Sequence, residues 1–178
     1  YFRGGSYTSS FNCRGFYSPM ENMPKGPAYA SDAVTEKMLE RDQADKYRII
    51  VDTDTAIMDE ATIDGIDRFV RGGGVFVTYG ETGRHSPEKR DSWPLARLTG
   101  FNLANEKTDG GTVTLDAGPQ IFPPSLTFPG AMDGRRFTAV APGVQKLLKW
   151  DDGSTAVGLR ALDKGYVVTV GPWFSNEN

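Results

Sequence analysis

Residues 47–83 read YRIIVDTDTAIMDEATIDGIDRFVRGGGVFVTYGETG, and this stretch decides the fold. Residues 47–52 form a short apolar run rich in β-branched side chains, which predicts a buried strand. Asp59 is a suitable cap for a helix that the glycines at 72–74 would end. Residues 75–79 predict a second buried strand. Between the two strands, apolar residues recur at the spacing of an amphipathic helix: Ile63, Ile66, Phe69 and Val70.

This order of strand, helix and strand predicts a βαβ unit, in which the two strands are parallel and the crossover is right-handed. An earlier helix is expected from an N-cap at Ser31 to about Ala44. That helix should lead in from another strand of the same sheet, either residues 28–30 or a strand further upstream. Its expected apolar face consists of Ala33, Val34, Met38 and Leu39.

The second half of the chain has a different character. After a polar loop at 81–92, residues 93–98 predict one or two helical turns that Gly100 stops. Short strands follow, and the turns Asp-Asp-Gly and Asp-Lys-Gly between the last three favour antiparallel hairpins. The final strand is expected to return to the main sheet. The four predicted strands are residues 112–115, 146–150, 155–159 and 166–170.

The expected fold class is therefore α/β, a parallel sheet flanked by helices with antiparallel hairpins in the C-terminal half. No repeat or linker divides the chain, so residues 28–178 are assigned to one domain. Residues 1–27 are rich in glycine, serine and aromatic side chains and are interpreted as an ordered irregular arm. The chain begins with Tyr1, which favours a piece of a longer protein.

Composition excludes several classes of function. The 178 residues carry a net charge of −3 with both signs mixed, so nothing favours nucleic acid or an anionic membrane as a partner. No stretch has the length of a membrane span. A single Cys13 and a single His85 argue against a metal site built from those residue types. The glycines at 72–74 precede a strand and so cannot form a phosphate loop, and no cofactor is expected.

Acidic side chains lie at or just after the carboxyl end of both strands of the βαβ unit. Asp52 and Asp54 end the first, and the second ends at a turn that contains Glu81. Neighbouring strands lie about 4.8 Å apart, so these carboxylates can form the pair, about 5 to 9 Å apart, that glycoside hydrolysis requires. His85 is a candidate general base. The ordinary alternative is that the aspartates cap the following turn, Glu81 accepts backbone hydrogen bonds and His85 holds its loop. The further candidates for ligand binding are Thr82, Arg84, His85 and Trp93.

A resemblance to a known family rests on residues 47–83 and two later stretches. These are TGRHSPEKRDSWPLARLTG at 82–100 and DDGSTAVGLRALDKGYVVTVGPW at 151–173. Together they resemble the class I glutamine amidotransferase-like domain, with its flavodoxin-like sheet, in the version attached to bacterial glycoside hydrolases and described as the β-galactosidase trimerisation domain. The resemblance covers roughly residues 28 to 172. In true amidotransferases the second strand leads into Gly-x-Cys-x-Gly, but Glu81 stands at the position of that cysteine. The family's downstream His-x-Glu pair is also missing, so the resemblance implies no glutaminase activity.

The resemblance instead implies a non-catalytic accessory or oligomerisation domain of a multidomain bacterial glycoside hydrolase, with no catalytic residues of its own. Its partners would be an upstream catalytic barrel and further copies in a trimer or dimer, in the bacterial cytoplasm or exported, with carbohydrate as a possible ligand. The aromatics of residues 1–17 would pack on that barrel or on a neighbouring subunit.

Two other functions remain open from the sequence. One is a small glycoside hydrolase that uses Glu81 with Asp54 or Asp52, with His85 nearby. The other is a carbohydrate-binding module that stacks sugars on exposed aromatic rings, which buried tryptophans would argue against. Trp150 and Trp173 are expected to be at least half buried. The candidate rings of such a module are Trp93, Trp150, Trp173 and Tyr79.

Overall fold

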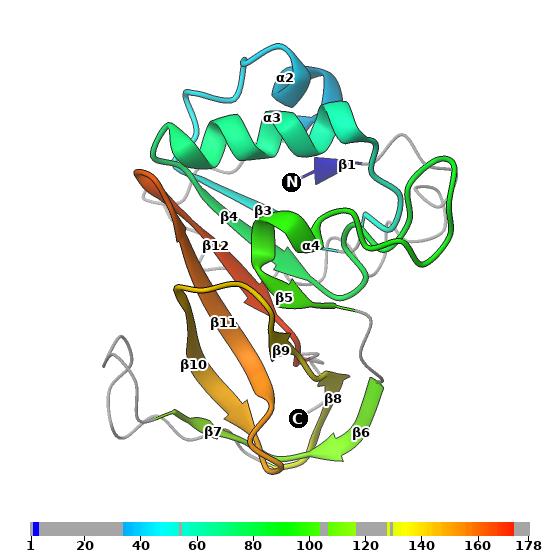
Figure 1. The fold of residues 1–178 in the computed structure, drawn as a ribbon, viewed down its shortest axis with the longest axis vertical. Helices are drawn as coiled ribbons and strands as arrows, with labels where there is room; N and C mark the ends of the chain where they lie inside the picture. The colour runs from blue at the N-terminus through cyan, green and yellow to red at the C-terminus, as the bar shows by residue number, and fades with distance from the viewer. Residues whose placement is uncertain are drawn as a thin grey trace, which may run out of the picture.

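A mixed six-stranded sheet forms the centre of the protein (Figure 1). The computed structural model describes residues 2–3, 34–53, 55–103, 107–116, 128 and 130–172. The strand order is β3–β4–β12–β11–β10–β7. β3, β4 and β12 are mutually parallel, and β12, β11, β10 and β7 are antiparallel neighbours, which confirms the predicted α/β class with hairpins in the second half. The strands are β3 Ile49–Thr53, β4 Val75–Tyr79, β7 Val113–Leu115, β10 Val144–Trp150, β11 Thr155–Leu162 and β12 Gly165–Val170.

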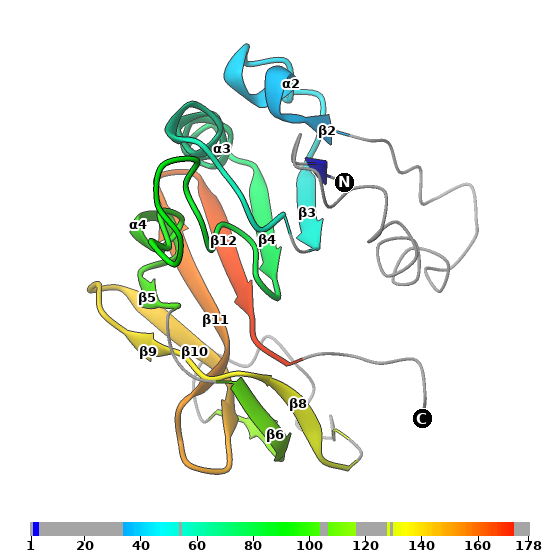
Figure 2. The same cartoon turned by 90° about the vertical axis from the view of Figure 1, so that its right-hand side faces the viewer.

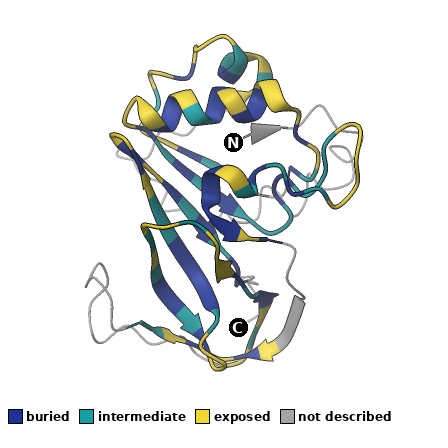
Figure 3. Cartoon of the chain, viewed as in Figure 1, coloured by how far each residue is buried: buried dark blue, intermediate teal, exposed yellow. Residues whose placement is uncertain are grey.

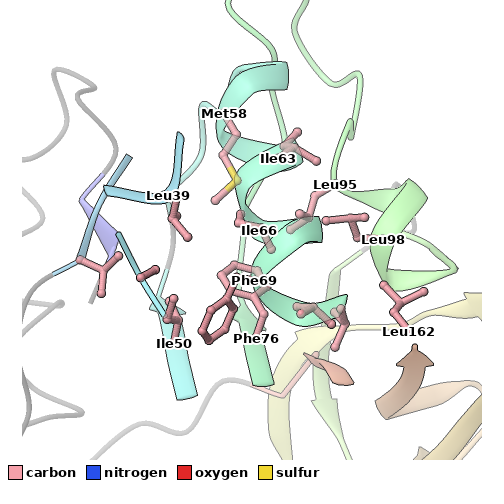
Figure 4. Packing of buried hydrophobic residues seen from close by; sticks show 14 residues of the cluster. Leu39, Ile50, Met58, Ile63, Ile66, Phe69, Phe76, Leu95, Leu98 and Leu162 are labelled. Atoms are coloured by element: carbon pink, nitrogen blue, oxygen red, sulfur yellow. The ribbon is translucent and has the colours of Figure 1, made fainter. Parts of the chain in front are cut away.

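Helix α3, Glu60–Arg71, connects β3 to β4 as the sequence predicts. Asp59 caps it, because its carboxylate accepts a hydrogen bond from the Thr62 backbone N–H at 2.8 Å. Beyond the helix, Gly73 has a φ of +116°, a conformation that favours glycine. Buried and exposed residues alternate along the helix (Figure 3). Its buried face packs on the sheet, where Ile50 and Phe76 meet Ile66 and Phe69 (Figure 4).

Helix α3 and the short helix in the loop after β4 lie on one face of the sheet (Figure 2). α2, Glu36–Glu40, packs against α3, and α4, Ala96–Thr99, follows the long loop after β4. Leu95 and Leu98 join the same buried cluster as α3. Gly100 ends α4 in the left-handed conformation, with a φ of +73°, as predicted.

The second half builds its own buried cluster around Trp150, which is 1% exposed as expected. Two small antiparallel pairs that the sequence did not predict flank the sheet there. β5, Phe101–Asn102, pairs with β9, Thr138–Ala139. β6, Lys107–Gly111, pairs with β8, Met132–Arg135. Trp173 lies outside the described residues.

The predicted first helix is wrong in its extent. Thr35, rather than Ser31, caps α2, and the chain leaves the helix after Glu40, because Asp42 takes a φ of +56°. Val34 belongs to strand β2, Val34–Thr35, which pairs in parallel with β1, Phe2–Arg3. Ser31, the strand expected at 28–30 and the rest of the aromatic-rich arm lie outside the described residues.

Candidate functional site

The turn after β4 holds the residues that the sequence placed at the carboxyl end of the sheet. Gly80 and Gly83 both have positive φ, +63° and +64°. The backbone N–H of Gly83 donates to Thr55 O at 2.8 Å, which fixes this turn to the segment after β3. A Cβ at Gly83 would lie 2.6 Å from the Cβ of Leu95. The turn is therefore packed directly against the side chain of Leu95, which leaves no room for a larger residue at Gly83.

Asp52 joins the two strand ends. Its side chain is fully buried, and its Oδ1 accepts a hydrogen bond from the Thr55 backbone N–H at 2.9 Å. The Thr82 hydroxyl, which has one proton to donate, lies 3.2 Å from Asp52 Oδ1 and 2.6 Å from Tyr79 O. Asp52 thus caps the turn, as in the ordinary interpretation. Asp54 lies outside the described residues.

Glu81 is held between two arginines. Its Oε2 lies 2.6 Å from Arg84 Nη1, and its Oε1 lies 2.5 Å from Arg135 Nη2. The Arg135 side chain comes from β8 and is only 6% exposed, against 22% for Glu81. Burial opposes ionisation of Glu81, but the hydrogen bonds and charges of the two arginines together outweigh it and lower the pKa of this carboxyl. Both carboxylate oxygens are engaged, and the group is ionised near neutral pH.

His85 is bound into its loop. Its Nδ1 accepts a hydrogen bond from the Asp91 backbone N–H at 2.9 Å. Its own backbone N–H donates to Ala56 O at 2.8 Å, and its carbonyl accepts from Met58 N–H at 3.0 Å. Arg84 Nε bonds the Asp91 carboxylate, so the same aspartate ties both residues of the loop together. This geometry matches a loop-stabilising histidine.

Trp93 lies beneath Arg135. Its ring is buried, and the Arg135 guanidinium carbon sits 5.0 Å from the ring centroid, within the range of a cation–π contact. Trp150 is buried as well, and its Nε1 donates to Arg135 O at 2.9 Å. Neither ring has an exposed face on which a sugar could stack. Tyr79 is half-buried.

Comparison with solved structures shows the fold. A β-galactosidase from Rahnella sp. R3 superimposes with a TM-score of 0.63 at 19% identity, over 81% of this chain and 22% of that one. A β-galactosidase from the haloarchaeon Halorubrum lacusprofundi gives a TM-score of 0.60 at 20% identity, over 82% and 22%. This chain has the fold of one part of a β-galactosidase. It spans about a fifth of the length of these two enzymes.

The same fold also occurs in a shorter protein. A cytoplasmic protein from Salmonella typhimurium LT2 matches with a TM-score of 0.63 at 14% identity, over 82% of this chain and 71% of that one. No family model matches the sequence, and no curated protein does. The comparisons therefore show the fold, and the function has to be argued from the site.

Arg135 is the residue of this site that the sequence analysis missed. It lies 54 positions after Glu81, in a strand whose sequence Met-Asp-Gly-Arg has no alternating apolar pattern. No signal in the sequence connects the two residues. Within the described part of the chain, no three His, Cys, Asp or Glu side chains are placed to hold a metal ion. None of the helices in that part is long and apolar enough to cross a membrane.

Proposed function

We propose that this chain is a non-catalytic accessory domain of a larger glycoside hydrolase related to the β-galactosidases. The observation that carries the proposal is the Glu81 carboxylate, fixed between Arg84 and Arg135 at the position where an amidotransferase would have its nucleophile. The shared fold supports it, because this chain matches only a fifth of each of the two β-galactosidases described above. The likeness to the amidotransferase-like domain is part of the same proposal.

The chemistry of Glu81 argues against a role in hydrolysis. A general acid has to carry a proton near neutral pH, which requires a raised pKa, whereas the pKa of Glu81 is lowered. A carboxylate nucleophile needs an oxygen free to approach the sugar, but each oxygen of Glu81 contacts a guanidinium. Asp52 is buried and accepts hydrogen bonds from the turn. These side chains hold the carboxyl end of the sheet together.

The partners of such a domain would be its own catalytic barrel and further copies of the chain, as a trimer or a dimer, in the bacterial cytoplasm or after export. We propose no cofactor for this accessory role. A carbohydrate-binding role is less well supported, since both Trp93 and Trp150 are buried.

Light scattering and a panel of chromogenic glycosides, applied to the same purified sample, test the proposal. We expect a defined oligomer and no turnover. Glu81→Gln is compared with Glu88→Gln, a control at an exposed position of the following loop. We expect Glu81→Gln to lower stability and leave the absence of turnover unchanged. Turnover by the unmodified chain that Glu81→Gln abolishes while the fold is kept, and that Glu88→Gln leaves intact, would overturn the proposal.

A further inference from the structure

Three polar side chains form a row across the parallel part of the sheet. Strand register places Thr78 of β4 between Asp52 of β3 and Thr169 of β12. Asp52 is 0% exposed, Thr78 4% and Thr169 1%. Two residues earlier on each strand the row is apolar and belongs to the buried cluster under α3: Ile50, Phe76 and Val167. The apolar core under α3 is therefore followed, toward the carboxyl ends of the strands, by a buried polar row.

The polar row of Asp52, Thr78 and Thr169 lies on the face of the sheet that carries α3, because residues two apart along a strand point to the same side. At one end of the row, the Thr82 hydroxyl lies 3.2 Å from Asp52 Oδ1. At the other end, Thr169 pairs with Gly158 of β11. A Cβ at Gly158 would lie 2.2 Å from Phe101 Cζ. The turn after β4 and the Phe101 ring thus cover the two ends of the row.

The Thr169 hydroxyl has no partner that accounts for its place in the core. Its Oγ1 is buried and has no hydrogen-bond partner among the described residues. Buried hydroxyl groups in proteins are hydrogen-bonded in the large majority of cases, since leaving one unpaired costs free energy. The adjacent residues of β12, Val168 and Val170, are valines, which have the shape of threonine without its hydroxyl. The position therefore requires a polar partner that the described residues do not supply.

We propose that the polar row binds an internal water molecule, which hydrogen-bonds to the Thr169 hydroxyl and to Thr78 or Asp52. A buried water molecule needs two to four polar partners. The row can provide them, because a hydroxyl both donates and accepts and a carboxylate offers about four lone-pair sites. Asp52 lies two strands, about 10 Å of backbone separation, from Thr169, which suits a bridge better than a direct hydrogen bond.

The inference does not depend on the proposed function. In open α/β sheets, ligands bind beyond the carboxyl ends of the strands. In this protein, the buried polar groups near those ends would be satisfied by enclosed solvent.

A crystal structure of the 178-residue chain, at a resolution that shows ordered water, tests this directly. We expect density for a water oxygen about 2.8 Å from Thr169 Oγ1. Thr78 Oγ1 or a carboxylate oxygen of Asp52 should lie within hydrogen-bond distance of the same peak. A protein group bonded to Thr169 Oγ1, or no density beside it, would overturn the proposal. A peak with several oxygen atoms at about 2.4 Å would also overturn it, because such distances indicate a metal cation.

Thr169→Val tests the same water molecule through stability. The substitution keeps the shape of the side chain and removes the hydroxyl, so a bound water would lose a partner and the urea midpoint should fall. A hydroxyl without any partner would give the opposite result, because its removal stabilises the protein. The matched control is Thr114→Val, at an exposed position of β7, which should shift the midpoint much less. A midpoint for Thr169→Val that is unchanged or raised relative to this control would overturn the proposal.

Discussion

The partners of a single residue decide what its carboxylate can do. Glu81 follows a strand end in the manner of a catalytic residue, yet Arg84 and Arg135 occupy both of its oxygens. The Arg135 guanidinium also stacks on Trp93, so one buried cation connects β8, the turn after β4 and the loop that returns from it. Removing one member of a partly buried ion pair leaves the other charge without compensation. We therefore expect substitutions in this cluster of Glu81, Arg84 and Arg135 to lower the stability of the protein rather than to change a catalytic rate.

The Glu81→Gln substitution measures how much the Glu81 ion pairs contribute to the free energy of unfolding and how that contribution depends on pH. Near neutral pH we expect the free energy of unfolding to fall by about 1 to 3 kcal/mol. The pKa of Glu81 is lower in the folded protein than its ordinary value of 4.5. Its stabilisation is therefore complete above the unfolded pKa and is lost as pH falls through the folded pKa. Urea unfolding should show the difference in free energy of unfolding between Glu81→Gln and the unmodified chain narrowing as the pH falls below 4.5.

Glu88→Gln, at an exposed position in the same loop, serves as the control and should change stability by less than about 0.5 kcal/mol at every pH. A difference for Glu81→Gln that stays constant across the whole pH range would contradict the ion-pair account.

At the scale of elements, sequence predicted the structure where local signals suffice. The Asp59 cap, the apolar spacing of α3 and the glycines that follow it all act within a few residues, and they gave the βαβ unit correctly. β8 could not be predicted, because its strand conformation comes from pairing with β6 and from a close approach at Gly134. A Cβ at Gly134 would lie 2.4 Å from Gly171 O. For the same reason the contact from Arg135 to Glu81 was missed, and the two strand-end carboxylates were found without their partners.

The packing of α2 on α3 depends on Gly65. A Cβ at this position would lie 2.6 Å from the backbone C and O atoms of Leu39, which cannot move without shifting α2. In an unpacked helix, Gly→Ala stabilises by about 1 kcal/mol. Here we expect Gly65→Ala to destabilise the protein by about 1 to 3 kcal/mol in urea unfolding, because the added methyl group overpacks the contact.

The matched control for Gly65→Ala is Ala61→Gly, at an exposed position of the same helix. It should cost about 1 kcal/mol through helix propensity alone. A gain in stability for Gly65→Ala would show that α2 does not hold this close position against α3.

Across the whole molecule, β12 connects the two parts. It pairs in parallel with β4 on one side and antiparallel with β11 on the other, so the sheet runs without interruption from the βαβ unit to the hairpins. Val167, in the middle of β12, is fully buried in the cluster beneath α3. The strand contributes Val168 and Val170 to the cluster around Trp150. A strand shared by both cores favours unfolding of the two halves as one cooperative unit.

Two spectroscopic probes report on different halves and test this cooperativity. Circular dichroism at the helical minimum follows α3, whereas tryptophan fluorescence follows the three tryptophans of the chain, of which Trp93 and Trp150 are buried. We expect the two urea transitions to coincide. Val167→Ala, which removes buried methyl groups from the shared strand, should shift both by the same free energy, about 2 kcal/mol. If Val167→Ala shifted the urea midpoint measured by circular dichroism but not the midpoint measured by fluorescence, the two halves would be separate folding units. The single-domain assignment would then be wrong.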